Sequence, residues 1–459
     1  MKDRATHVKS KVKSKVKSNT TKGEMHMLHR WSRAARPAAL VVAASGLVLG
    51  VLGASAGVAG AAFKSPSTYP AYVGGHGKAN PRLSPITIGV VNQQTAAAAP
   101  APAWTTGVKV GVTYVNKHTG GIDGHPLKAV YCSIPTTVGA ATKCGQEFAD
   151  NSAISTVLVG AVDVGNTALE SALKPAKIPQ YFAVSLSTVD EHDPYGFILY
   201  NTATQVEAPM ASVAHDLHMK SISLVYPSDI PGNVYQAKVV YDALKYVGIK
   251  HIYKVGFTSN ATSFSAPFEA AHVGHTTLLI VVNSGGPACS DAYLTLKSLG
   301  VATKQKVLVN VPCDTPTIAK ADGGTLPHNW YYLTANPLPG SPTPAVTAAV
   351  KAFTPYGKGP IAYDAWAADA FGQVLTVAKL DTEILKAHRK VTRATVFAKT
   401  RAFKGPIVQG APHLACGRFK GTPATCNNLD RFFKNTAPNV MKPLGTWIGP
   451  PKGFKPPLS

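Results

Sequence analysis

Short runs of apolar residues alternate along the chain with segments whose apolar positions recur three or four residues apart. The run at 86–91 (ITIGVV) is typical of a buried strand, and the apolar or small residues from Trp104 to His118 fall on one face of a helix. The same alternation predicts strands at 127–132, 156–161 and 179–184, and helices at about 138–151 and 166–174.

The alternation starts again near residue 205, with a helix that ends at His218. Short, wholly apolar strands between amphipathic helices indicate parallel sheets that are covered on both faces. Two such series predict an α/β fold with two doubly wound parallel-sheet lobes, joined by crossover strands. The second series comprises strands at 221–227, 252–257, 278–283, 306–311 and 330–334, and helices at 233–246 and 289–299. After this series, further helices are expected at about 343–353, 362–380 and 391–402.

The first helix and the second strand are joined by two glycines and a second turn, in the stretch 114–132 (YVNKHTGGIDGHPLKAVYC). Gly120 or Gly121 is expected to take the left-handed conformation that ends a helix, where a Cβ costs about 1 kcal/mol or more. Ile122 then packs under the last helical turn, and a tight turn leads into the strand. We therefore interpret the glycines as a helix-to-strand return, since their spacing fits neither phosphate-binding fingerprint.

The formal net charge of +23 is concentrated at the N-terminus, where residues 1–36 hold eleven Lys or Arg and two acids. No charged residue follows from Pro37 to Phe63. A basic flank, an apolar run and small residues are the order of a secretory signal peptide. An uncleaved membrane anchor is the alternative, because the run is long enough to span a bilayer. The remaining chain shows no basic cluster with interleaved aromatic residues, so we expect no nucleic-acid partner.

These features predict a basic n-region with a signal peptide or anchor at 1–62 and a Pro/Gly/Ser-rich linker at 63–84. Six cysteines follow the export signal, and an even number in that context suggests disulfides. Pairing of neighbours is our first choice among 15 connectivities, and buried free thiols are the alternative. The cysteines are Cys132 and Cys144, Cys289 and Cys313, and Cys416 and Cys426.

Several of these segments together resemble the branched-chain amino-acid-binding family of solute receptors, which serve ABC transporters and have the type I periplasmic-binding-protein fold. The resemblance is carried by ITIGVV, by the pattern G-x(8)-N-x(3)-GGI-x-G from Gly107 to Gly124, and by the strand LKAVYC. VLVGAVDVGNT, IPQYFAV and SISLVYPSDIPGN follow in the family's order. The resemblance to the family is clear over roughly residues 85–335 and only loose over residues 336–450.

The resemblance implies an exported receptor that closes two lobes on a small polar or amphipathic molecule, such as an amino acid or amide, and delivers it to an ABC permease. It implies no cofactor, and a membrane contact only through an uncleaved N-terminal segment. We expect one lobe from 85–203 plus about 336–430, and the other from 204–335 plus about 431–459. A cell-surface sensory module of the same fold, without transport, is the alternative. An enzyme is not expected, because H-E-x-x-H and P-loop motifs are absent.

The family's site, carried over position by position, falls on loops that follow strands. In the family the loop after the third strand is hydroxyl-rich and binds the ligand carboxylate, whereas here it reads DVGNT. The acid that receives an ammonium group has no clear counterpart, and two aspartates compete for that role, Asp314 and Asp163. Each position also has a structural interpretation, as a helix cap, a turn or a core residue. The candidate ligand-binding residues are Trp104, Asp163, Val164, Gly165, Asn166, Ser185, Ser187, Asp229, Gly232, Asn283 and Asp314.

Overall fold

The computed structural model describes residues 65, 67–94, 101–135, 137–201, 207–261, 263–282, 286–310, 313, 316–334, 344–357, 364–408, 410–437 and 440–455. Ala56–Ser459 form one compact unit. The apolar segment expected to be a signal peptide or anchor lies outside the described residues. Among those residues, none of the helices combines the length and the apolar character that a membrane crossing requires.

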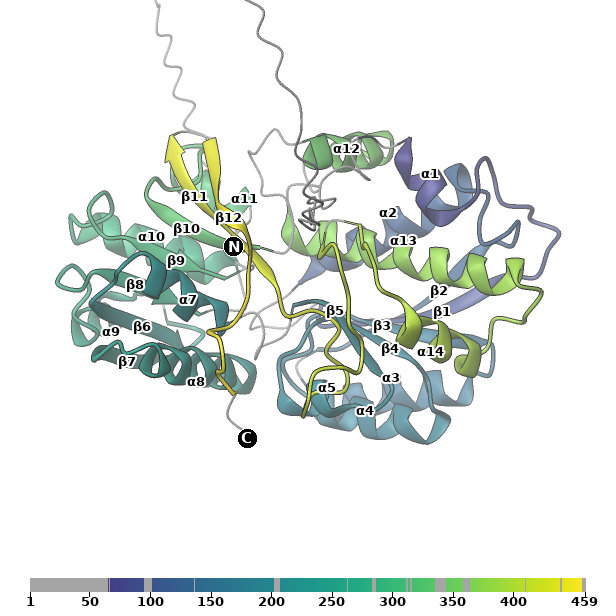
Figure 1. The fold of residues 1–459 in the computed structure, drawn as a ribbon, viewed down its shortest axis with the longest axis horizontal. Coiled ribbons are helices and arrows are strands. Elements are labelled where there is room, and N and C mark those ends of the chain that lie inside the picture. Colours follow the sequence, from purple (N-terminus) through teal and green to yellow (C-terminus); the bar gives the residue numbers. More distant parts are fainter. Residues whose placement is uncertain are drawn as a thin grey trace, which may run out of the picture. The chain divides into compact units, whose positions relative to one another are not determined.

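The first lobe is built on a five-stranded sheet in which every pairing is parallel (Figure 1). The strand order is β2-β1-β3-β4-β5, so the order reverses between β1 and β3. Buried, β-branched runs such as ISTVLV explain why these strands lie inside the sheet. The strands are β1 (Ile86–Asn92), β2 (Leu127–Ser133), β3 (Ile154–Val159), β4 (Gln180–Val184) and β5 (Gly196–Asn201).

Helices cover both faces of this sheet, and each face has its own apolar core. On one face α2 (Pro102–His118) packs closely against the long helix α13 (Ala365–Lys386). Gly107 and Gly111 permit this approach, because a Cβ on either residue would lie within 3 Å of α13 atoms. On the other face α3 packs against α4. The remaining elements of this lobe are α1 (Thr68–Val73), α3 (Val138–Asp150), α4 (Asn166–Leu173), η1 (Lys174–Ala176), α5 (Thr188–His192), α12 (Pro344–Phe353), η3 (Thr354–Tyr356) and α14 (Arg393–Ala402).

The second lobe is built on a seven-stranded sheet of order β12-β11-β10-β9-β8-β6-β7. Five strands are parallel, and the hairpin β11–β12 joins β10 in antiparallel orientation. Its strands are β6 (Ser221–Pro227), β7 (His251–Phe257), β8 (Leu278–Val281), β9 (Val307–Val309), β10 (Trp330–Thr334), β11 (Asp430–Ala437) and β12 (Val440–Ile448). Its helices are α7 (Pro209–Asp216), α8 (Pro231–Tyr246), α9 (Ser265–Ala270), α10 (Gly286–Ser298) and α11 (Pro316–Ala321). The α/β class with two parallel-sheet lobes is thus confirmed.

Strand β5 and helix α1 are among the elements that the sequence did not predict. Strand β5 is an edge strand of the first sheet, and its residues Phe197 and Tyr200 are fully buried. Helix α1 forms within the stretch for which the sequence predicts a linker. Tyr69 of α1 is fully buried and makes edge-to-face contacts with Tyr114 and Phe371. This aromatic packing stabilises α1 against the first lobe. The Pro/Gly/Ser-rich composition of the segment does not reveal it.

The double-glycine turn has the conformation that the sequence predicts. Gly120 and Gly121 both have positive φ, at 78° and 72°. The Gly121 amide donates to the Val115 carbonyl at 3.0 Å and Ile122 is fully buried. The stretch therefore ends α2 and leads into β2.

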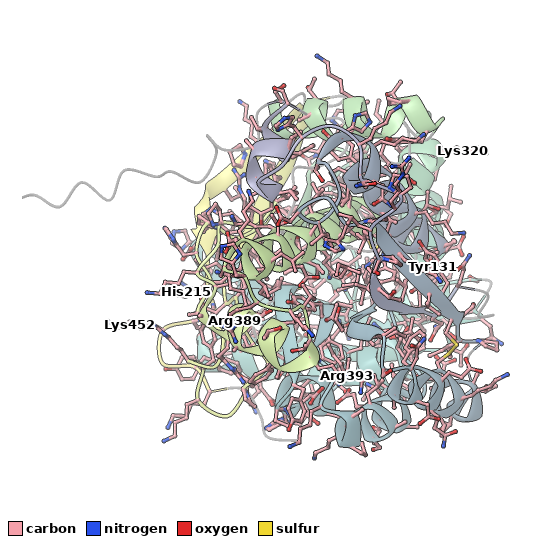
Figure 2. All side chains as sticks on the ribbon, turned by 90° about the vertical axis from the view of Figure 1, so that its right-hand side faces the viewer. Tyr131, His215, Lys320, Arg389, Arg393 and Lys452 are labelled. Atoms are coloured by element: carbon pink, nitrogen blue, oxygen red, sulfur yellow. A yellow bond between two sulfur atoms is a disulfide. The ribbon has the colours of Figure 1, made fainter. Side chains whose placement is uncertain are left out.

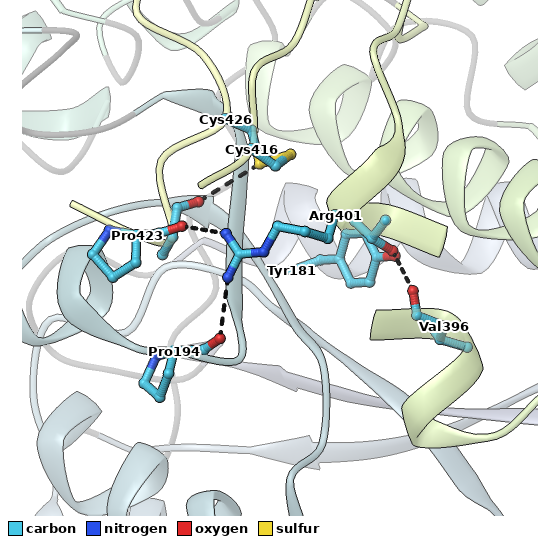
Figure 3. The surroundings of a disulfide bond; sticks show 9 residues. Tyr181, Pro194, Val396, Arg401, Cys416, Pro423 and Cys426 are labelled. Atoms are coloured by element: carbon cyan, nitrogen blue, oxygen red, sulfur yellow. Dashed lines mark hydrogen bonds between the residues drawn. A yellow bond between two sulfur atoms is a disulfide. The ribbon is translucent and has the colours of Figure 1, made fainter. Parts of the chain in front are cut away.

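The cysteines form three neighbour pairs, as in our first choice: Cys132–Cys144, Cys289–Cys313 and Cys416–Cys426. The last pair closes a loop that follows α14 (Figure 3). Beside it Arg401 donates to the Pro423 carbonyl at 2.8 Å and to the Pro194 carbonyl at 3.4 Å. The disulfide closes this loop on itself, and Arg401 joins the loop to Pro194, just before β5.

Candidate functional site

The carboxyl ends of β1 and β3 meet at the place where the strand order of the first sheet reverses. In open α/β sheets this is where ligands bind. Gln93 follows β1 and is fully buried, and Asp163 follows β3 and is 5% exposed. The Asp163 amide donates to Gln93 Oε1 at 3.2 Å. Two polar residues from neighbouring strands are therefore fixed together at the switch point.

The carboxylate of Asp163 is buried without a hydrogen bond to either oxygen in the described part of the chain. Burial, and secondarily the charge of Asp190, raise the pKa of Asp163 to about 7. The Gln93 side chain opposes this shift and lowers the pKa of Asp163. Buried ionisable groups with shifted pKa values occur often at functional sites, and Asp163 combines this feature with its place at the switch point.

The N-terminus of α8, from the second lobe, lies against this carboxylate. A Cβ built on Gly232 would lie 3.1 Å from Asp163 Oδ1 and 3.0 Å from the Leu186 carbonyl oxygen. The absence of a side chain at residue 232 thus permits the close approach of α8. Nearby, the Tyr235 hydroxyl donates to Glu191 Oε2 at 3.4 Å, which is a second contact between α8 and the first lobe.

Asn166 and Ser187 bring the loops after β3 and β4 together. The Asn166 amide donates to Ser187 Oγ at 2.6 Å and to Asp190 Oδ1 at 3.2 Å. Ser187 caps α5 in a reciprocal capping box with Asp190, whose Oδ2 also accepts from the Leu186 amide at 2.7 Å. These side chains satisfy one another's hydrogen-bonding groups, and their contacts join the loops after β3 and β4. The two loops lie beside the carboxylate of Asp163, which has no hydrogen bond within the described chain.

The other predicted residues of the first lobe have structural contacts. Ser185 is fully buried and its hydroxyl donates to the Ser187 carbonyl at 3.0 Å. Gly165 has φ 89° and precedes α4, and a Cβ there would lie 2.6 Å from Ala141. Val164 is half-buried. Trp104 is fully buried in the first turn of α2, with no hydrogen bond to its indole nitrogen among the described residues.

Asp229 forms a turn, which is the structural alternative that the sequence leaves open. Its carboxylate is exposed and accepts from the Ser259 amide and hydroxyl, both at 2.8 Å. Both of its oxygens are therefore already bonded. Asn283 and Asp314 lie outside the described residues.

A hollow of about 420 Å³ lies between α4 and α5, and it contains none of the predicted site residues. It is lined in part by Glu170, Lys174, His192 and Asp193. Burial and the neighbouring Asp190 raise the pKa of Glu170, and burial also raises the pKa of Asp190. Burial, and then the charges of Glu191 and Asp190, raise the pKa of Tyr235 in α8, so the charge of these two acids reaches the second lobe.

A second group of buried acids lies where the chain passes between the lobes. Glu207 precedes α7 and accepts from the Asn310 amide at 3.4 Å, and burial raises its pKa to about 8. Asp430 begins β11, and burial together with Glu207 and Asp369 raises its pKa well above the ordinary value. In both acids, burial therefore disfavours the charged form.

Sequence reasoning missed Gln93, Asp190, Glu191 and Tyr235. A signal existed for Asp190, because Ser187 followed three residues later by an acid is a capping pattern. A polar residue directly after an apolar strand, as at Gln93, is a second signal. No local pattern marks the contact between Glu191 and Tyr235, because it joins residues 44 positions apart.

Comparison with known proteins gives a family and a set of structural neighbours. The family model for periplasmic binding proteins matches residues 85–425. A fatty acid ABC transporter substrate-binding protein from Thermomonospora curvata has a TM-score of 0.68 at 14% identity, covering 83% of this chain and 98% of its own. No curated protein matches the chain.

Two further neighbours are named for branched-chain amino acids. A leucine-binding protein from Thermotoga maritima has a TM-score of 0.62 at 16% identity, covering 80% of this chain and 99% of its own. A branched-chain amino acid transporter substrate-binding protein from Streptococcus pneumoniae, in complex with isoleucine, has a TM-score of 0.63 at 15% identity. It covers 79% of this chain and 99% of its own. At these identities the similarity establishes the fold.

Proposed function

Because the chain belongs to the periplasmic binding protein family, we propose that it is an exported receptor that closes two lobes on a small molecule and delivers it to an ABC permease. The observation that carries this proposal is the position of Asp163. It is a buried carboxylate, unpartnered among the described residues, at the switch point of one lobe, and α8 of the other lobe lies against it. Hinge closure around a ligand is the motion that suits such a site.

The ligand that we propose is a small polar or amphipathic molecule, such as an amino acid or an amide. Neighbours of the same fold are named for leucine, isoleucine and fatty acids. The capped loops of Asn166 and Ser187 form a rigid wall, and the α8 terminus supplies backbone N–H groups. These features support recognition of a compact ligand with at least one polar end.

The protein's place in the cell follows from the same proposal. A binding protein that serves a permease works outside the cytoplasm, and three disulfides suit an oxidising compartment. The basic, apolar N-terminal segment supports export, with cleavage or with a membrane tether. The lobes are proposed to be 85–203 plus about 336–430, and 204–335 plus about 431–459. The binding cycle requires neither a cofactor nor a catalytic step.

A thermal-shift screen of the purified full chain tests this function. The panel contains amino acids, amides, small carboxylic acids, amines and sugars. A ligand at 100 times its dissociation constant stabilises the folded state by about 2.7 kcal/mol. We expect one chemical class to raise the melting temperature in a saturable manner. The absence of a shift with every compound at saturating concentration contradicts the proposed function.

A further inference from the structure

We propose that the surface around α14 of the first lobe docks on an anionic phospholipid bilayer. The inference goes beyond the proposed function, because it concerns a surface of the receptor and not its ligand. Three features support it: the concentration of positive charge in one segment, the exposure of that charge in the fold, and the point at which the chain enters the first lobe.

The first feature is the charge of residues 384–429, which comprise the end of α13, α14 and the loop that follows. This segment holds nine Lys or Arg and no Asp or Glu. The whole chain after residue 36 holds 35 Lys or Arg and 21 Asp or Glu. Most of the net positive charge outside the N-terminus therefore belongs to this one segment.

The second feature is the exposure of these side chains. Arg393 and Arg401 are half-buried and donate to backbone carbonyls. Lys399 forms an ion pair, with its Nζ 2.7 Å from Glu383 Oε2. The other six, which we call the basic face, are exposed and have no ion pair within the described chain: Lys386, Arg389, Lys390, Lys404, Arg418 and Lys420.

The residues of the basic face flank both ends of α14. Arg389 and Lys390 precede the helix, and Lys404 follows it. The loop of Arg418 returns to the last turn of α14, because a Cβ on the neighbouring Gly417 would lie 2.3 Å from an Arg401 guanidinium nitrogen. Along α14 itself an exposed stripe at four-residue spacing consists of short side chains, Ala394, Ala398 and Ala402. Long basic side chains around short ones can reach a flat, charged surface together.

The third feature is the entry of the chain into this lobe. Helix α1 lies beside the basic face, since Lys386 donates to the Gly74 carbonyl at its end and the Tyr72 hydroxyl donates to the Pro406 carbonyl at 3.2 Å. The apolar segment of the sequence ends at Phe63, five residues before α1 begins at Thr68. Five residues span at most roughly 18 Å. A bilayer that retained the apolar segment would therefore lie within reach of the basic face.

The observations favour a bilayer over a nucleic acid. Single-stranded nucleic acid is bound by exposed aromatic side chains on which its bases stack. The three phenylalanines of the segment are half-buried, and two of them, Phe397 and Phe403, pack against the apolar core of the first lobe. The proposed receptor also works beside the membrane that holds its permease, and docking there would raise the effective concentration of the two partners.

Co-sedimentation of the full chain with lipid vesicles tests the inference. One set of vesicles contains phosphatidylglycerol and phosphatidylcholine in equal parts, and the other contains phosphatidylcholine alone. We expect at least ten-fold stronger partitioning onto the anionic vesicles, weakened by salt because salt screens exposed charges. The basic N-terminal residues are the same in every variant, so a comparison of variants isolates the basic face.

The decisive variant reverses three charges of the basic face, Arg389→Glu, Lys390→Glu and Lys404→Glu. It should lower the partition coefficient at least ten-fold, at the salt concentration at which half of the unchanged protein is bound. The control changes the net charge equally at three exposed lysines of the second lobe, and it should bind as the unchanged protein does: Lys297→Glu, Lys304→Glu and Lys320→Glu. Circular dichroism checks that both variants are folded.

Trypsin cleavage gives a local readout on the unchanged chain. Anionic vesicles should protect the bonds after Arg389 and Lys390 and leave the bond after Lys304 accessible. Equal losses in the two triple variants, equal binding to both kinds of vesicle, or no protection would overturn the inference. Tighter binding of a DNA duplex than of the vesicles, lost in the basic-face variant, would also overturn it. Each of these results leaves the proposed function intact, whereas vesicle binding without affinity for any panel compound would contradict that function alone.

Discussion

Asp163 of the first lobe and Gly232 of the second lobe are in contact, with Asp163 Oδ1 3.1 Å from the position of a Cβ on residue 232. That position is also 3.0 Å from the Leu186 carbonyl oxygen. The first of these atoms belongs to the short side chain of Asp163 and the second to the backbone of Leu186, so neither can move aside as the end of a long, flexible side chain could. The arrangement around the Asp163 carboxylate therefore depends on a glycine in the first turn of α8.

Gly232→Val should weaken ligand binding while both lobes remain folded. The larger side chain meets Leu186 and Asp163 only when α8 lies against the first lobe, so it opposes the closed arrangement. We expect at least a ten-fold loss of affinity, or about 1.4 kcal/mol, measured by calorimetry with the best ligand of the panel. Gly139→Ala in α3 is the control, because a Cβ added to Gly139 would have open space around it, with no contact within 4 Å. Equal affinities for Gly232→Val and the unchanged protein would show that this contact has no part in binding.

Arg393 is expected to be a major source of stability in the first lobe. This half-buried residue of α14, labelled in Figure 2, lies on the first lobe. It donates to five backbone carbonyls at 2.9–3.4 Å, those of Phe148, Ala149, Asn151, Ile154 and Ala176. Arg393→Met should lower the free energy of unfolding by about 2–3 kcal/mol, since these carbonyls lose a charged donor. Arg393→Lys should recover only part of this lost stability, because a lysine ammonium group cannot reproduce the planar array of N–H donors of the guanidinium group.

The control for Arg393 is Arg389→Met, at an exposed position four residues earlier that Figure 2 also labels. Surface substitutions usually change stability by about 0.5 kcal/mol or less. Urea denaturation of the three variants measures the differences. An equal loss in Arg389→Met and Arg393→Met would contradict the importance of the five carbonyl contacts.

The disulfides should differ in their contribution to stability. Cys289–Cys313 and Cys132–Cys144 close segments of 24 and 12 residues, and each doubling of a loop adds about 0.6 kcal/mol to its closure entropy. The first pair is also fully buried at both ends. The double alanine variant of Cys289 and Cys313 should therefore lose more stability than that of Cys132 and Cys144, by chemical denaturation. The reverse order would contradict this prediction.

The buried acids predict that stability falls as the pH rises. Burial raises the pKa of Asp381 to about 8 from its ordinary 3.8, so the folded state holds this proton more tightly than the unfolded state. The stabilisation from protonation is complete below about pH 4 and is lost as the pH rises to 8. Asp381→Asn should raise the free energy of unfolding at pH 8 by roughly 1–3 kcal/mol and change it little at pH 4. A larger effect at pH 4 would contradict the assignment.

Much of the fold could be predicted because it depends on local patterns. Parallel strands in the interior of a sheet are wholly apolar, and the turn at Gly120 and Gly121 depends on a backbone conformation that glycine permits. The helix α1 could not be predicted in this way. Its support is the packing of Tyr69 on Phe371, a contact between residues that are distant in sequence.

The site shows the same limit. The sequence places Asp163, Asn166 and Asp229 on loops after strands, but it does not show which oxygens the chain itself uses. Asn166 pairs with Ser187, 21 residues away, and Asp229 pairs with Ser259, 30 residues away. Of these three side chains, only that of Asp163 has no such partner within the described chain. That distinction depends on tertiary structure and is invisible in the composition of the loops.

Native mass spectrometry of the full chain with the best ligand of the panel distinguishes a receptor from an enzyme. We expect one added ligand mass per chain, lost on denaturation, with the compound recovered chemically unchanged. Binding should weaken in Asp163→Asn and in Gly232→Val. A chain that retains none of the panel compounds, or that converts one of them into a product, would contradict a receptor that closes on a small molecule.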